Sequence, residues 1–366
     1  MASGQTDETQ VANELPFTTT ADATISRREQ VMRHADNYVV APFRILWSDW
    51  RARVGFLIIV FYVLMGTIGV LMNPVPYTGM GPRYLQPFHA GWFTLESVSL
   101  FGVSLPLDPQ FNLILGTGAL GQGIWSQLVH STPAMLKMIL AGAVFSAVFG
   151  TVLGTLAGYK GGLIDRGIMM LSDVTLTIPG LPLVIIIAAA LQPKNPYLIG
   201  FILGINNWAG LSRAVRSQVL SVRERNFVEA SRSMGLSTPR ILADDILPDL
   251  MSYVSINFVQ ASRGIIFESV GLYYLGILPF TTLNWGVMMN LAYTTSGALY
   301  TWKSAHWLFL PMLTITLLSV GLILFSQGLD QIFNPRVRAR HVKAVSSTGA
   351  DDEETDVTPM SNVPTN

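Results

Sequence analysis

The most chemically distinctive stretch of this sequence is a polar segment, residues 225–250, which reads RNFVEASRSMGLSTPRILADDILPDL. It lies between two strongly apolar blocks, 183–191 and 254–277. Glu229 is the only acidic residue among its first ten positions. Its carboxylate can accept a charge-assisted hydrogen bond from a basic group of another protein, or pair weakly with Arg232 three positions later. The segment therefore offers the chemistry of protein–protein contact.

The apolar blocks contain few other ionisable residues: Asp173, Arg263 and Glu268, with His306 at the end of one block. Charges inside a membrane usually face protein or a water-filled path. Arg263 and Glu268 lie five positions apart, which is about 140° around a helix, so they do not share a face. We expect each charge to pair with a neighbour in this chain or in a partner subunit, and contact with a transported solute is the alternative.

Pro179 lies with Pro182 in the sequence TIPGLP, which interrupts an apolar block. Proline frees backbone carbonyl groups, and such breaks are tolerated in a membrane where protein or a cavity covers them. The break predicts either a kink that lines a translocation path or a kink that serves packing. Asp173, Pro179, Arg263 and Glu268 are thus the candidates for path lining or intramembrane pairing.

The sequence contains no pattern typical of an enzyme. There is no cysteine, which excludes disulfides, thiolate metal sites and a cysteine nucleophile, and the five histidines are scattered. A G-x-x-x-x-G-K-[ST] phosphate-binding loop is also missing, so ATP hydrolysis would require another subunit. We expect no catalytic residue, metal site or cofactor in this chain, and no nucleic-acid partner.

The elements that position these residues are expected to be transmembrane helices. Half of the residues are apolar and only 13% are charged, compared with about 25% in soluble domains. A helix needs about 20 apolar residues to cross the hydrocarbon core. The sequence predicts an all-α polytopic membrane protein with six transmembrane helices, centred on residues 55–72, 134–158, 167–191, 198–211, 251–275 and 307–329.

The distribution of basic residues predicts the orientation. If the N-terminus is cytoplasmic, 18 of the 23 Lys and Arg residues lie on the cytoplasmic side. The four expected outside or at the outer border are Arg83, Lys137, Lys194 and Lys303, and Arg263 falls inside a span. Because cytoplasmic loops are enriched in Lys and Arg, this asymmetry predicts a multi-pass protein of the cell membrane with both termini in the cytoplasm.

These patterns divide the chain into consecutive regions. The first is polar and expected to be disordered, and the second mixes arginine with aromatic residues, as interfacial helices do. A long external loop follows the first helix, and the end of the chain is acidic. The expected regions are a disordered segment (1–30), an interfacial amphipathic segment (31–53), the first transmembrane helix (54–73), an external loop (74–133), a core of five transmembrane helices with a cytoplasmic loop at 221–248 (134–329), and a cytoplasmic tail (330–366).

The polar segment is expected to form two short helices around a glycine turn. Arg223–Met234 fits a helix, and Gly235 supplies a left-handed stop. Pro239 suits the first turn of a second helix, and Leu247 with Pro248 ends the pattern just before the fifth span. Such a unit would be a rigid helix–turn–helix that projects into the cytoplasm. A plain interfacial loop is the alternative.

The motif EASRSMG…DILP resembles the signature loop of permease subunits of ATP-binding-cassette (ABC) importers. The family form is Glu-Ala-Ala, three residues, Gly, nine residues, Ile, one residue, Leu-Pro. Ser231 replaces the second alanine, and Asp245 occupies the isoleucine position. The matching positions, which the resemblance implies contact an ATPase subunit, are Glu229, Ala230, Gly235, Leu247 and Pro248. In the family, the glutamate pairs with a basic residue in a groove of the ATPase.

The resemblance extends over about residues 110–340 and is to the dipeptide, oligopeptide and nickel branch, specifically to the second permease of such systems. It implies a type I ABC importer permease fold. The implied partners are a second homologous permease subunit, two cytoplasmic ATP-binding subunits, an external solute-binding protein and membrane lipid. One departure is LGTGALGQGIWSQL, in which Gly118, Gln122, Gly123 and Gln127 replace residues that are charged in the family.

We therefore interpret the chain as the permease subunit of an ATP-driven importer, which forms the path for a small, peptide-like solute delivered by an external binding protein. An ion-coupled secondary transporter is the first alternative, and it would require midplane acids or histidine relays and inverted repeats. The sequence has at most one well-placed carboxylate in each span and no clear repeat. A membrane enzyme would need a cluster of His, Asp and Ser near one face.

Overall fold

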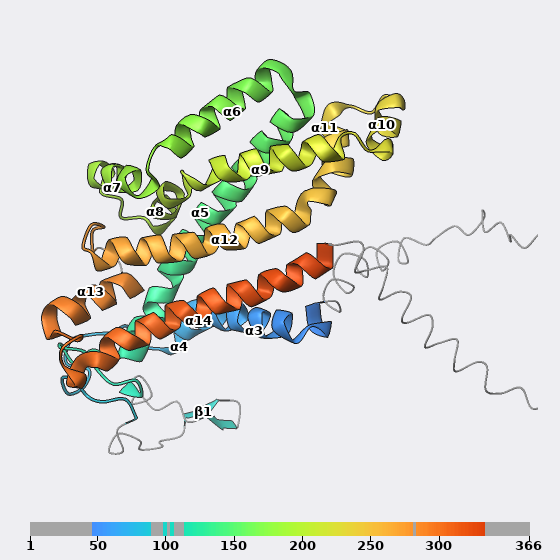
Figure 1. Cartoon of the computed structure of the whole chain (residues 1–366). Coiled ribbons are helices and arrows are strands. Elements are labelled where there is room, and N and C mark those ends of the chain that lie inside the picture. The colour runs from blue at the N-terminus through green and yellow to red at the C-terminus, as the bar shows by residue number, and fades with distance from the viewer. Residues whose placement is uncertain (1–45, 89–97, 101–102, 106–112, 281–282, 334–366) are drawn as a thin grey trace, which may run out of the picture. The chain divides into compact units, whose positions relative to one another are not determined.

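The computed structural model describes residues 46–88, 98–100, 103–105, 113–280 and 283–333. The predicted disordered segment 1–30, most of the interfacial segment 31–53 and nearly all of the tail 330–366 lie outside these residues. Figure 1 shows that the described chain is dominated by helices, as the sequence predicts for this class. The remainder includes a short antiparallel hairpin of β1 (Val98–Leu100) and β2 (Val103–Leu105), which the all-α expectation did not include.

The first span consists of three consecutive helical pieces. These are α3 (Trp50–Leu64), the π-helical turn η3 (Met65–Gly69) and α4 (Val70–Met72). The helix starts four residues before the expected boundary, because the Asp49 side chain accepts a hydrogen bond from the Arg51 backbone N–H at 2.9 Å and caps it. α3 packs along α14 (Trp302–Phe333), and a Cβ on Gly55 would overlap the backbone N of Phe325.

The second span, α5 (Ile124–Lys160), starts ten residues before the expected Ala134. The sequence placed the boundary after Pro133, whereas the structure keeps this proline inside the helix. The preceding residues are held in helical form by burial, since Ile124, Leu128 and Val129 are almost inaccessible to solvent. Tertiary packing thus outweighs the loss of one backbone hydrogen bond, and residues 124–133 are helical instead of part of the external loop.

The third and fourth predicted spans are both interrupted. α6 (Gly162–Thr177) and α7 (Gly180–Leu191) are bent by 83° at the break before Pro179–Gly180. α8 (Pro196–Gly204) ends before Asn206, and α9 (Asn207–Val222) follows. The nine residues of α8 reach only about 14 Å at 1.5 Å per residue, which is too short to cross about 30 Å of hydrocarbon. The fourth block is therefore not one continuous helix.

The helices whose length and apolar character allow membrane crossing are fewer than six. Within the described residues they are Trp50–Met72, Ile124–Lys160 and Trp302–Leu329, with the bent α6–α7 pair as a fourth if it counts as one span. α12 (Leu247–Tyr274) is long enough but carries Asp249, Arg263 and Glu268. The chain is therefore helical with at least three apolar spans, and the count of six remains a prediction.

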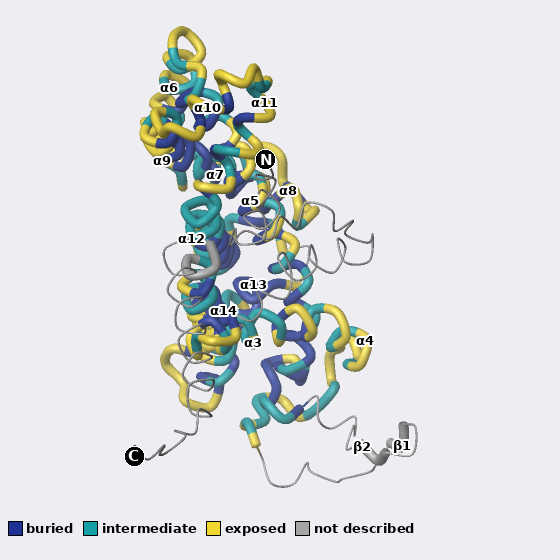
Figure 2. The backbone as a smooth tube through the Cα atoms, turned by 90° about the vertical axis from the view of Figure 1, so that its right-hand side faces the viewer, coloured by how far each residue is buried: buried dark blue, intermediate teal, exposed yellow. Residues whose placement is uncertain are grey.

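Two large aromatic residues join the elements of the main core. Trp285 begins α13 (Trp285–Ser296), and its indole N–H donates to the Leu128 carbonyl of α5 at 3.3 Å. Tyr62 of α3 meets it edge to face, with ring centroids 5.8 Å apart, and its hydroxyl donates to the Thr314 carbonyl of α14 at 2.8 Å. Both side chains are buried, so this contact links α3, α5, α13 and α14. Figure 2 colours the backbone by burial and shows stretches of buried residues along the helices of this core.

A row of glycines brings α5 and α9 into direct backbone contact. Gly150, Gly154 and Gly158 recur every fourth residue and therefore share one face of α5. A Cβ on Gly150 would lie 2.8 Å from the Trp208 carbonyl oxygen, and one on Gly154 would overlap that of Ser212. Small residues that permit close approach are the usual basis of helix association in membranes.

Substituting Gly154 with alanine is therefore expected to destabilise the fold. The added methyl would have to displace backbone atoms, and overpacking typically costs about 1–3 kcal/mol. The measurement is the free energy of unfolding in mixed micelles. Gly167→Ala in α6 is the matched control, because a Cβ there meets nothing within 4 Å. Equal stability of the two variants would contradict the role of close α5–α9 packing.

Candidate coupling segment and polar residues of the spans

The coupling segment begins with α10 (Asn226–Ser233), which ends in a left-handed turn. Gly235 has φ of +75°, the conformation expected from the sequence. Its N–H donates to the Arg232 carbonyl at 3.0 Å, and the Leu236 N–H donates to the Ser231 carbonyl at 3.2 Å. This pair of bonds is a Schellman motif, which satisfies carbonyl groups that the end of the helix leaves open. The turn direction is therefore fixed by the backbone of Gly235.

The second half of the segment differs from the prediction. α11 (Thr238–Ile241) runs into the π-helical turn η5 (Leu242–Ile246) and then directly into α12, so Leu247 and Pro248 start a helix and do not end one. Pro248 lacks an N–H, and its ring would clash with the carbonyl four residues earlier in a regular helix. A wider π-helical turn just before it accommodates the proline without breaking the helical path.

An apolar cluster attaches the coupling segment to the neighbouring helices. Val228 of α10 and Ile241 of α11 are almost inaccessible to solvent, as are Ile246 and Leu250 where α12 begins. They pack with α9 residues that include Val219. An ion pair adds a second connection, from Arg225 to Asp249, with Nη1 and Oδ2 3.0 Å apart. The segment is therefore packed as one unit against α9 and α12.

The opposite face of α10 is exposed and has no partner within the described residues. Phe227, Ala230 and Met234 share this face at helical spacing, and Phe227 and Met234 are 44% and 72% exposed. Glu229 beside them is exposed. The expected pair with Arg232 is not formed among the described ion pairs, because the Arg232 guanidinium lies 5.6 Å from the centroid of the Tyr159 ring. The carboxylate of Glu229 remains available to another protein.

The charged residues of α6 and α9 line a surface pocket of about 410 Å³. Arg213 donates to Asp173 at 2.6 Å, so the structure gives Asp173 a partner within this chain. Arg216 donates to Asp165 through Nε and Nη2 at 2.5 and 2.6 Å. These hydrogen bonds hold the pKa of the Asp165 carboxyl, which precedes the predicted third span, below its ordinary value. The two ion pairs join α6 to α9.

Arg263 and Glu268 form no ion pair with each other. Their spacing on one helix predicts this separation. Arg263 donates from Nη1 to the Gln260 side-chain oxygen at 2.9 Å, while its buried Nε has no partner in the described structure. Pro179 lies immediately before α7, where the chain turns by 83°. Among the described ion pairs, Asp173 is therefore the only one of these four candidates that has an oppositely charged partner.

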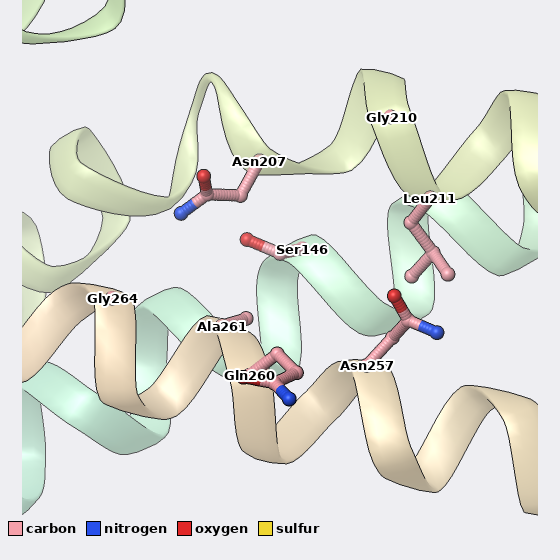
Figure 3. Close-up of a pocket in the computed structure, with 8 residues that line it drawn as sticks. All are labelled: Ser146, Asn207, Gly210, Leu211, Asn257, Gln260, Ala261 and Gly264. Carbon is pink, nitrogen blue, oxygen red and sulfur yellow. The ribbon is translucent and has the colours of Figure 1, made fainter.

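A polar pocket between α5, α9 and α12 was not predicted from the sequence. Its volume is about 290 Å³, and Figure 3 shows the side chains that line it. We call it the carboxamide pocket, lined by Ser146, Asn207, Gly210, Leu211, Asn257, Gln260, Ala261 and Gly264. Asn257 and Gln260 lie one helical turn apart within a predicted span, and polar residues there often mark a site, so this signal was present in the sequence.

The glycine-rich sequence that departs from the family pattern packs against α14 at Gly118. A Cβ on Gly118 would lie 2.8 Å from Cε2 of Trp307, so a larger residue would displace this indole. Thr117 accepts a hydrogen bond from the Leu85 N–H at 3.0 Å, and Gln86 donates to the Lys303 carbonyl at 2.7 Å. These turns, which the sequence predicts to be external, are therefore packed against the start of α14.

Comparison with known proteins identifies relatives along most of the chain. Residues 150–339 match the family described as "Binding-protein-dependent transport system inner membrane component". The dipeptide transport system permease protein DppC of Bacillus subtilis is 28% identical over 85% of this chain and 89% of its own. The oligopeptide permease OppC of Mycobacterium tuberculosis H37Rv is 30% identical over 62% and 76%. The nickel permease NikC of Escherichia coli K12 is 27% identical over 68% and 88%.

Proposed function

The chain belongs to the family of binding-protein-dependent transport system inner membrane components, whose match covers more than half of it, and we propose that it forms the translocation path for a peptide-like solute. The protein is a multi-pass membrane permease of the ABC importer class. Two of the relatives described above are named for dipeptide or oligopeptide transport and one for nickel, which supports peptides as the first candidate. The ion-coupled alternative has no support from these relatives.

The proposed power source is a pair of cytoplasmic ATP-binding subunits, one of which docks on the exposed face of α10. The observation that carries this proposal is a fixed Schellman turn at Gly235, packed on α9 and α12, beside an exposed carboxylate of Glu229. A packed two-helix unit transmits a push that a flexible loop would absorb. Leu247 and Pro248 continue this unit into α12, so movement of the segment would displace a helix of the core.

The remaining partners are also proposed, because they are the ones that the family match implies. We infer a second homologous permease that completes the path, and an external binding protein that delivers the solute. The external loop is long and aromatic and would lie on the delivery side. The test is reconstitution of the chain with these partners, measuring ATP hydrolysis stimulated by peptide-loaded binding protein. A parent complex that assembles but shows no stimulation by any loaded binding protein would overturn the proposed function.

The proposed orientation gives a direct labelling prediction. Thr78→Cys and Ser221→Cys place single thiols at exposed positions of a chain that lacks cysteine. A membrane-impermeant maleimide added to intact cells should label position 78 and should label position 221 only after the membrane is opened. The expectation rests on the excess of Lys and Arg on the side of residue 221. Labelling of both thiols in intact cells would show that the orientation is wrong.

A further inference from the structure

The carboxamide pocket lies where one face of α9 meets one face of α12. Asn207, Gly210 and Leu211 share a face of α9, while Asn257, Ala261 and Gly264 do so on α12. Ser146 of α5 lies between them, as Figure 3 shows. The pocket is therefore built by three elements, and α5 is one of the helices able to cross the membrane.

Two glycines keep this pocket open. A Cβ on Gly210 or on Gly264 would meet nothing within 4 Å, in contrast to the glycines of α5 that touch α9. Close helix packing therefore does not require glycine at either position. Because neither position carries a side chain, free space is left beside the polar groups of the lining.

The lining offers hydrogen-bonding groups that the protein itself leaves unused. Asn257 donates one N–H to the Tyr253 carbonyl at 2.8 Å, which orients its amide and leaves its oxygen as an acceptor. Gln260 accepts from Arg263 through its oxygen, so its NH2 group remains a donor. Because arginine only donates and a backbone carbonyl only accepts, these partners fix both amide orientations. Ser146 donates to carbonyls of α5 and α8, at 2.8 and 3.0 Å.

We propose that the carboxamide pocket is a transit subsite for the peptide bonds of the transported solute. A peptide unit presents one N–H donor and one C=O acceptor, which are complementary to the free oxygen of Asn257 and the free NH2 of Gln260. All side chains of the lining are uncharged. The subsite therefore reads the backbone common to all peptides, with the charged Arg263 guanidinium beside it, hydrogen-bonded to the Gln260 oxygen. This inference rests on the proposed function and names the chemistry of its path.

Neutral hydrogen bonds suit a path better than ion pairs do. A conducting site must bind strongly enough to admit the solute and weakly enough to release it. Charge-assisted hydrogen bonds are roughly twice as strong as neutral ones, and a buried charge would also select against peptides of the same sign. The lining would thus guide peptides without retaining them, while the external binding protein carries out the selection.

The test uses the complete transporter in proteoliposomes with radiolabelled tri-alanine as the probe. Gln260→Met and Asn257→Leu keep side-chain size but remove the amides, and Gly264→Leu fills the space. Gly271→Leu is the matched control, since it lies on the same helix outside the pocket and a Cβ there also meets nothing within 4 Å. Uptake of tri-alanine and ATP hydrolysis stimulated by the loaded binding protein are measured together.

We expect the three pocket variants to assemble and to hydrolyse ATP like the parent, while peptides transported per ATP fall. The fall should be about fivefold for Gln260→Met and Asn257→Leu, as for one lost neutral hydrogen bond, and Gly264→Leu should lower transport by occupying the space. The control should match the parent, and a merely structural role would lower uptake and ATP hydrolysis together. Asn257→Gln, which keeps the amide, should restore most of the uptake. If Asn257→Leu fails to assemble, Gln260→Met decides, because Gln260 is exposed and its replacement removes one side-chain hydrogen bond, to Arg263, but no buried side chain.

The outcomes separate this inference from the proposed function. Parental uptake by the pocket variants, or an equal loss in Gly271→Leu, would overturn the subsite and leave the importer function intact. ATP-driven uptake of Ni²⁺ but not of tri-alanine by the parent would overturn the subsite together with peptide as the proposed solute, and would leave the importer class intact. A parent complex that shows neither uptake nor stimulated ATP hydrolysis would overturn the proposed function and the subsite with it.

Discussion

Replacing Gly235 with valine is expected to reduce substrate-stimulated ATP hydrolysis and transport by at least about tenfold. Gly235 has φ of +75°, a region that costs an ordinary L-residue about 1–2 kcal/mol and a β-branched residue more. A Cβ at this position meets nothing within 4 Å, so the loss would come from the backbone and not from a clash. The turn would open, and the exposed face of α10 would point away from its partner.

Two control measurements separate a misdirected turn from a misfolded chain. Gly235→Asn should retain most of the activity, because asparagine adopts left-handed backbone conformations more readily than other residues. The purified Gly235→Val chain should keep its helical content and its membrane insertion, since the spans lie elsewhere. If Gly235→Val couples ATP hydrolysis to transport like the parent, the left-handed turn does not position the coupling segment.

Replacing Glu229 with alanine is expected to weaken coupling by roughly ten- to hundred-fold. A hydrogen bond to a charged group typically contributes about 1.5–3 kcal/mol, and every 1.4 kcal/mol corresponds to a factor of about ten. Glu229 is exposed and forms no ion pair among the described residues, so its removal should leave the fold unchanged. The measurement is the concentration of ATP-binding subunit needed for half-maximal stimulated ATP hydrolysis.

The control for this variant lies in the same part of the chain. Glu224→Ala removes an exposed carboxylate before α10 and should behave like the parent. Glu229→Gln keeps the shape but loses the charge, and should fall between the parent and Glu229→Ala. Delivery of solute by the binding protein should be unaffected in all three. Equal affinity for the ATP-binding subunit in Glu229→Ala and Glu224→Ala would show that the segment is only an interfacial loop.

One helix connects the coupling segment to the carboxamide pocket. α12 starts at Leu247, directly after the π-helical turn, and carries Asn257 and Gln260 about three turns later. Since the helical path has no break at Pro248, a displacement of α10 and α11 would reach the wall of the pocket without passing through a loop. In the proposed mechanism, the subunits that hydrolyse ATP thus act on the path through α12.

The features that depend on local chemistry could be predicted without the structure. The apolar blocks predict a helical membrane protein because hydrocarbon admits only helices with satisfied backbone groups, or closed barrels. Gly235 is recognisable as a turn because it follows a helical pattern, and glycine tolerates positive φ. The 140° separation of Arg263 and Glu268 follows from helical geometry, and the structure indeed leaves them unpaired with each other.

The positions at which helices begin, and the distant residues that meet, depend on tertiary packing. Burial carries α5 back to Ile124 through Pro133, a position that a propensity argument assigns to a boundary. The π-helical turn before Pro248 turns a predicted stop into a continuous helix. The carboxamide pocket depends on α9 and α12, which no local pattern relates. Packing energy arises from contacts between such distant segments, and these contacts are absent from any short window of sequence.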